Sequence, residues 1–156
     1  MINIRIDYLP LVLLIMSSGI FTSIADAARI TSQQKPDSGL YSWVAESEGF
    51  SIELIQVLPD FIRAIYMSHD FPQQEVDEIA GYCVFGTVIK NTSQKQLDYD
   101  VSEWYYTDKQ GNNYPVKTKS QWLEQWRKAG VTFSWTLLPD KGTFYEGDWQ
   151  QGFTTI

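Results

Sequence analysis

The feature that most constrains this chain is a series of short runs in which apolar and polar residues alternate. In the clearest run, residues 131–137, every second residue is apolar: Val131, Phe133, Trp135 and Leu137. Residues 50–54 alternate in the same way, and residues 82–90 form the most strand-like run of the chain. Alternation with a period of two places apolar side chains on one face of a half-buried strand. The pattern therefore predicts a mainly β domain.

Turn-forming residues separate these runs and predict how the strands connect. Asn91-Thr92-Ser93 lies between residues 82–90 and residues 97–107, which predicts a hairpin of two strands. A second turn is expected at residues 108–113, where Gly111 supplies a positive φ. Strands divided by turns at short spacing are typical of an antiparallel β-sandwich.

Helical patterns interrupt the predicted strands near residues 60–80 and 119–129. The first region divides into residues 61–67 and 73–80, the second of which Gly81 terminates. The second region begins with Thr118 and Gln121 at the spacing of a capping box. These segments are expected to be short helical insertions in the β domain.

The amino-terminal segment has the pattern of a secretory signal peptide. Arg5 precedes the apolar residues 9–16, and Ala25-Asp26-Ala27 fits the rule for a cleavage site. Residues 1–27 are therefore predicted to be a cleavable leader, with an uncleaved anchor as the alternative. The leader predicts a bacterial protein that is periplasmic or secreted and that leaves the membrane after cleavage. Residues 28–39 are expected to form a flexible linker, and residues 40–156 a single domain.

The charge of the chain limits its partners. The formal net charge is −7, and an acidic surface is repelled by nucleic acid and by anionic lipid. We therefore expect no nucleic-acid partner. An envelope or extracellular protein is the expected partner, with carbohydrate as the alternative.

One segment resembles a known group of domains. Residues 83–116 contain the run GTVIKNTSQKQLDYDVSEWYYTDKQGNNYPV, in which Asn91-Thr92-Ser93 ends one strand and Asp108, Gly111 and Asn112 form a later turn. This run is similar to the central hairpin of bacterial extracellular immunoglobulin-like (telokin-like) domains of unknown function. The resemblance implies an immunoglobulin-like β-sandwich and no particular activity.

Side chains that are soft or borderline metal ligands are few. His69 is the only histidine and Cys83 the only cysteine, and neither lies in a recognised catalytic motif. We therefore predict a protein that is not an enzyme and needs no cofactor. Cys83 lies in an apolar run and is expected to be buried and inert. Met67, His69 and Cys83 are weak candidates for a copper site, because soft ligands suit copper.

Acidic residues offer two further candidate sites. Asp98 and Asp100 lie on one side of a predicted strand, with Asp108 beyond. Grouped carboxylates can hold calcium, and a pair of them can hydrolyse a glycosidic bond. The alternative is that the strand carboxylates face water and that Asp108 forms a turn.

Tryptophans are the candidate ligand-binding residues. Trp122 and Trp126 lie one helical turn apart, and glycines flank Trp149. Either these rings pack in the core or they form an exposed platform for sugar or protein. The expected function is an exported, non-enzymatic binding or accessory module of the bacterial envelope. The alternatives are a carbohydrate-binding module that uses exposed tryptophans, a periplasmic copper-binding protein and a hydrolase.

Overall fold

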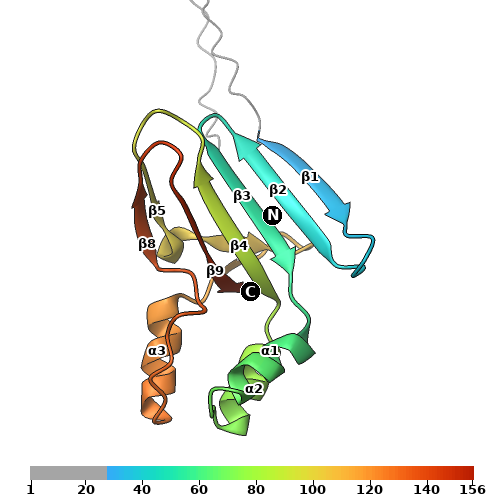
Figure 1. Ribbon diagram of the computed structural model, residues 1–156, viewed down its shortest axis with the longest axis vertical. Helices are drawn as coiled ribbons and strands as arrows, with labels where there is room; N and C mark the ends of the chain where they lie inside the picture. Colours follow the sequence, from blue (N-terminus) through green and yellow to red (C-terminus); the bar gives the residue numbers. More distant parts are fainter. Residues whose placement is uncertain (1–27) are drawn as a thin grey trace, which may run out of the picture.

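The computed structural model describes residues 28–156, so the predicted leader lies outside the described residues. A five-stranded antiparallel sheet dominates the fold, in the order β1-β2-β3-β4-β9 (Figure 1). Its strands are β1 (Arg29–Gln34), β2 (Tyr41–Ser47), β3 (Phe50–Gln56), β4 (Val84–Asn91) and β9 (Trp149–Thr155). The predicted mainly β fold is confirmed.

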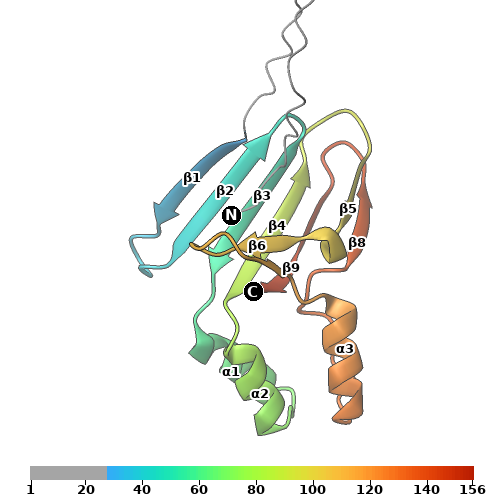
Figure 2. The same cartoon turned by 180° about the vertical axis from the view of Figure 1, so that it is seen from behind.

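Two shorter strand pairs lie against one face of this sheet. They are β5 (Leu97–Asp100) with β8 (Lys141–Phe144), and β6 (Tyr105–Thr107) with β7 (Asn113–Pro115). Figure 2 shows β6 crossing that face. The pairs and their connections bury Ile52 and Ile89 of the large sheet beneath an apolar cluster, which contains Tyr99, Val101, Val116, Leu138 and Phe144.

Three helices lie at one end of the sheet (Figures 1 and 2). They are α1 (Pro59–Met67), α2 (Gln73–Ala80) and α3 (Lys119–Lys128), and all three were predicted. Thr118 and Gln121 form the expected capping box of α3. Trp122 and Trp126 of α3 pack with α1 and α2 in a second apolar cluster. No helix within residues 28–156 is long and apolar enough to cross a membrane.

The expected linker and the expected hairpin differ from the structure. Residues 29–34 are not a linker, because β1 pairs with β2 along its whole length. The predicted hairpin of residues 82–90 with 97–107 is wrong, because β3 and β9 occupy both edges of β4. Asn91 redirects the chain there: its side-chain amide donates to the carbonyls of Lys95 (2.7 Å) and Phe144 (3.2 Å). The chain then pairs with β8 instead.

Two other predicted strands are interrupted. Residues 97–107 bend at η1 (Val101–Glu103), a 3-10 turn that begins where the Asp100 carboxylate accepts the backbone N–H of Ser102. Residues 131–137 do not form a strand, apart from a single parallel bridge between Leu137 and Phe153. Here the alternation reflects packing rather than strand pairing, since Val131, Phe133 and Leu137 all contact the helical cluster, whereas Trp135 is exposed.

Candidate functional site

The two faces of the large sheet have different surroundings. Successive residues of a strand point to opposite faces, so the register assigns each residue to one of them. One face, here called the covered face, includes Ile52, Thr87, Ile89 and Thr154, which are all buried. No helix or strand pair crosses the opposite face in Figure 1, although the helical cluster reaches its lower end through Val84. We call this opposite face the open face.

Beyond Val84 and Thr155, which are buried at the helical end, the open face consists of three rows of side chains that run across the strands. In the order β9, β4, β3, β2 and β1, the rows are Trp149, Lys90, Ser51, Glu46, Arg29; Gln151, Val88, Glu53, Val44, Thr31; and Phe153, Gly86, Ile55, Ser42, Gln33. Among these residues Ser42 alone is buried. The sheet therefore presents a broad and largely accessible surface of mixed character.

A hollow lies in this surface where Gly86 lacks a side chain. Its volume is about 290 Å³, and its lining includes Ile55, Val88, Phe153 and Trp135. Trp135 is 68% exposed. Its ring contacts those of Phe133 (centroids 5.0 Å apart) and His69 (5.6 Å). The hollow thus has an apolar lining that includes an indole ring supported by its neighbours.

A second exposed indole lies farther along the same face. Trp149 is 58% exposed and is four residues from Phe153 on β9. At a rise of about 3.4 Å per residue, this separation is roughly 13–14 Å. Gln151 lies between them on the same face and is exposed. The edge of the open face along β9 therefore carries two aromatic groups with an amide between them.

The charges of the open face balance, although the chain as a whole is acidic. Arg29 and Lys90 are matched by Glu46 and Glu53, whereas the chain has a formal net charge of −7. The residues around the hollow carry no charge. The open face therefore offers no net electrostatic attraction for a strongly charged ligand.

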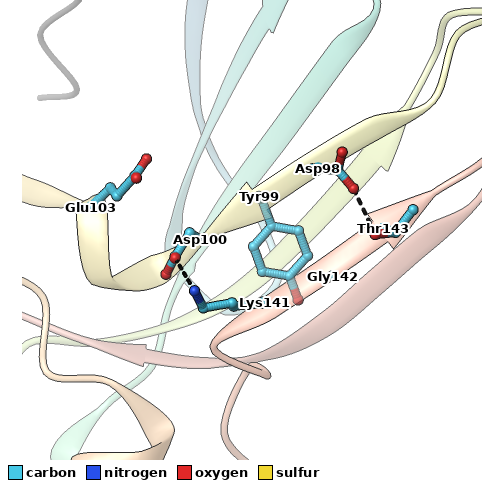
Figure 3. Close-up of a pocket in the computed structure, with 7 residues that line it drawn as sticks. All are labelled: Asp98, Tyr99, Asp100, Glu103, Lys141, Gly142 and Thr143. Carbon is cyan, nitrogen blue, oxygen red and sulfur yellow. Dashed lines mark hydrogen bonds and ion pairs between the residues drawn. The ribbon is translucent and has the colours of Figure 1, made fainter.

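An acidic concavity of about 550 Å³ lies beside β5 and β8 (Figure 3). The Asp100 carboxylate is 2.6 Å from the Lys141 ammonium. The hydrogen bond from Lys141, followed by those from Ser102, lowers the pKa of Asp100 to about 2. Asp98 accepts a hydrogen bond from the Thr143 hydroxyl (2.6 Å). Glu103 points away from these pairs in Figure 3.

This arrangement does not match the acidic sites expected from the sequence. A glycosidase pairs a carboxyl of raised pKa with an ionised one, and Asp100, which Lys141 holds ionised, does not suit the role of the acid. Asp108 is engaged in its own turn, where it accepts the backbone N–H groups of Gln110 and Asn112. Within residues 28–156 no three His, Cys, Asp or Glu side chains are grouped as a metal site. The expected calcium trio is therefore not assembled.

Of the candidate copper ligands, His69 and Cys83 belong to no group of three or more His, Cys, Asp or Glu side chains within residues 28–156. Met67 is exposed on α1, and the His69 ring lies on Phe133 with centroids 4.1 Å apart. The prediction that Cys83 is buried is wrong, because its residue is exposed just before β4. Its backbone, not its thiol, is engaged there, in two hydrogen bonds with Ile156.

Two of the three candidate tryptophans are inaccessible to a ligand. Trp122 and Trp126 are fully buried, so their assignment to an exposed platform is wrong. The Trp122 indole N–H donates to the Thr155 hydroxyl (2.9 Å), and the Lys117 ammonium lies 3.4 Å from its ring centroid. These rings attach α3 to the sheet. Trp149 is exposed, as a binding residue requires.

Sequence reasoning missed Trp135 as a surface residue. Trp135 shares the alternation of residues 131–137 with Leu137, which is buried. The difference arises where residues 136–138 run beside β9: the Phe153 N–H donates to the Thr136 carbonyl (2.7 Å), and the Leu138 N–H donates to the Phe153 carbonyl (2.9 Å). Nothing in the local pattern distinguishes Trp135 from its buried neighbour.

No protein-family model, curated protein or solved structure matches the chain. The resemblance of residues 83–116 to immunoglobulin-like domains thus remains a prediction.

Proposed function

We propose that this protein is an exported, non-enzymatic binding module of the bacterial envelope, and that the open face is its ligand-binding surface. The observation that carries the proposal is the exposure of Trp135 beside the hollow at Gly86. The proposal places the protein in the periplasm or outside the cell, as the leader-like residues 1–27 suggest.

The physical argument concerns the ring and its support. An indole group that is two-thirds exposed leaves a large apolar area in contact with water, and burial of such area is favourable. Trp135 is packed against Phe133 and His69, so little side-chain freedom remains to be lost when a ligand covers it. Rigid aromatic groups of this kind commonly dominate binding energy at interfaces.

The proposal includes the finer description of the fold. Strand β6 crosses the covered face, and the β5–β8 pair at the β9 side contributes Tyr99 and Phe144 to the apolar cluster beneath it, as a second layer of an immunoglobulin-like sandwich would. Sandwich domains with one accessible sheet face serve many binding functions, and the fold alone selects none of them.

Export is tested separately from binding. Expression of the full chain in a bacterial host, followed by fractionation and amino-terminal sequencing, is expected to give a mature protein that begins at Ala28. Retention of the uncleaved chain in the membrane fraction would contradict the periplasmic or secreted location.

Binding is tested with the purified protein immobilised and exposed to bacterial envelope extract. Wild type is expected to retain one component in stoichiometric amount, and Trp135→Ala is expected to lose it. Tyr114→Ala is the matched control, because Tyr114 is an exposed aromatic residue of β7, and β7 pairs with β6, which crosses the other side of the sheet. Equal retention by wild type and Trp135→Ala, or no retention by wild type, would overturn the assignment of the open face.

A further inference from the structure

The exposed edge of the open face along β9 has a chemical composition that points to one class of ligand. Two indole rings, Trp135 and Trp149, lie near opposite ends of a strip that contains Gln151 and the hollow at Gly86. The strip carries aromatic, amide and aliphatic groups, and the charges of the surrounding face cancel.

We infer that this strip binds an extended, uncharged polysaccharide chain that lies along β9. The inference rests on the proposed function and names its ligand. The faces of a pyranose ring present C–H groups, which pack on the electron-rich face of an indole. The sugar hydroxyls require donors and acceptors at the side, and the Gln151 amide supplies both. The hollow at Gly86 accommodates a ring or substituent that projects toward the sheet.

The charge balance excludes the main competing ligands of an aromatic surface. An acidic polysaccharide would meet a protein with a net charge of −7 and no excess of basic groups on this face, so association would be unfavourable. A basic peptide would be attracted to the acidic concavity beside β5 and β8, not to this strip. An uncharged chain gains favourable contact with the two rings and avoids the free-energy cost of removing charged groups from water.

The geometry also favours an extended chain over a coiled one. The separation between Trp149 and the hollow follows a single straight strand, β9, at roughly 13–14 Å. Trp149 on β9 and Trp135 beside the hollow contact one ligand at both ends only if the ligand follows that direction. Extended chains such as cellohexaose or chitohexaose are therefore expected to bind more tightly than maltohexaose, which coils.

The test is isothermal titration of the full protein with cellohexaose, chitohexaose and maltohexaose, with a hyaluronan hexasaccharide as the acidic probe. Tryptophan fluorescence is recorded in parallel. Wild type is expected to bind at least one of the two extended neutral probes, with a change in tryptophan emission. Failure to bind either of them, or tighter binding of hyaluronan, overturns the inference.

Three variants locate the binding. Trp135→Ala is expected to weaken binding about tenfold or more, the range of a dominant aromatic contact, and Trp135→Phe to restore part of it. Gly86→Val fills the hollow and is expected to weaken binding similarly. A Cβ at Gly86 meets Ile55 at 3.7 Å, an ordinary contact, so the variant is expected to fold. Tyr114→Ala is the control and should bind as wild type does.

The outcomes separate this inference from the proposed function. If the extended probes bind equally to wild type, Trp135→Ala and Gly86→Val, sugar does not occupy the strip and the inference fails. If no probe binds while retention of an envelope protein still depends on Trp135, the inference fails and the binding function stands. If neither probe nor envelope component depends on Trp135, both fail.

Discussion

The two faces of one sheet differ in what covers them, although they share the same five strands. On the covered face Ile52 and Ile89 are buried beneath residues of two short strand pairs and their connections. On the open face Val88, the chain neighbour of Ile89, remains partly exposed near Trp135. The backbone pairing is identical for both faces, so the difference comes from side chains and from where the later segments of the chain pack.

This contrast shows which side chains stabilise the fold and which remain available for a ligand. A side chain on the covered face is surrounded by protein, so its removal leaves a cavity. A side chain on the open face contacts water, and its removal costs the fold little. The same separation applies to the tryptophans, since Trp122 is fully buried and Trp135 is largely exposed.

The largest expected effect on stability is the difference between alanine substitutions of these two tryptophans. Trp122→Ala removes a fully buried ring and the hydrogen bond to Thr155, and is expected to lower the free energy of unfolding by about 3–5 kcal/mol. Trp135→Ala is expected to lower it by less than about 1 kcal/mol. Denaturant unfolding followed by circular dichroism measures both. Similar losses in the two variants would mean that Trp135 supports the fold.

The next largest effect on stability is the difference between alanine substitutions of two neighbouring residues of β4 that point to opposite faces of the sheet. Ile89→Ala empties a fully buried site and is expected to lower the free energy of unfolding by about 2–5 kcal/mol. Val88→Ala removes a partly exposed side chain, with an expected loss of about 1 kcal/mol or less. Chemical denaturation of both variants provides the measurement, and a larger loss for Val88→Ala would reverse the assignment of the faces.

Two glycines provide a third, smaller contrast. A Cβ at Gly152 would clash with the Leu138 backbone, whereas at Gly86 its nearest contact would be Ile55 at 3.7 Å. Gly152→Ala is therefore expected to cost about 1–3 kcal/mol through overpacking, and Gly86→Ala to have little effect on stability. Thermal unfolding of the pair tests this. A stable Gly152→Ala would show that residues 136–138 do not pack closely on β9.

The smallest expected effect on stability is electrostatic. It concerns the ion pair between Asp100 of β5 and Lys141 of β8, which are not strands of the large sheet. Because the pKa of Asp100 is lowered from 3.8 to about 2, its carboxylate contributes stability above pH 3.8, and this contribution is lost as the pH falls toward 2. Lys141→Ala should move the Asp100 midpoint back toward 3.8, as measured by NMR titration of the carboxyl carbon. An unchanged midpoint would show that the ion pair does not form in solution.

The sequence predicted those parts of the fold that local interactions determine. The capping box at Thr118 and Gln121 defined the start of α3, and alternation defined β3. The pairing partners of β4 and β5 could not be predicted, because they depend on contacts distant in the chain. An example is the bond from the Asn91 amide to the Phe144 carbonyl.

The candidate site was predicted only in part, for the same reason. Trp149 was chosen from the glycines around it, and it is exposed. Trp122 and Trp126 were assigned to the surface as one possibility, but packing of α3 against α1 and α2 buries them. Trp135 becomes a surface residue only because residues 136–138 run beside β9, a long-range contact that periodicity does not encode.

The most direct test of the central claim is an NMR titration that follows the indole N–H signals of the six tryptophans. The titrant is the neutral hexasaccharide or envelope component that wild type retains. The account predicts that the Trp135 and Trp149 signals move, while those of the buried Trp122 and Trp126 stay in place. Shifts confined to other tryptophans, with Trp135 and Trp149 unchanged, would show that the ligand does not bind the open face.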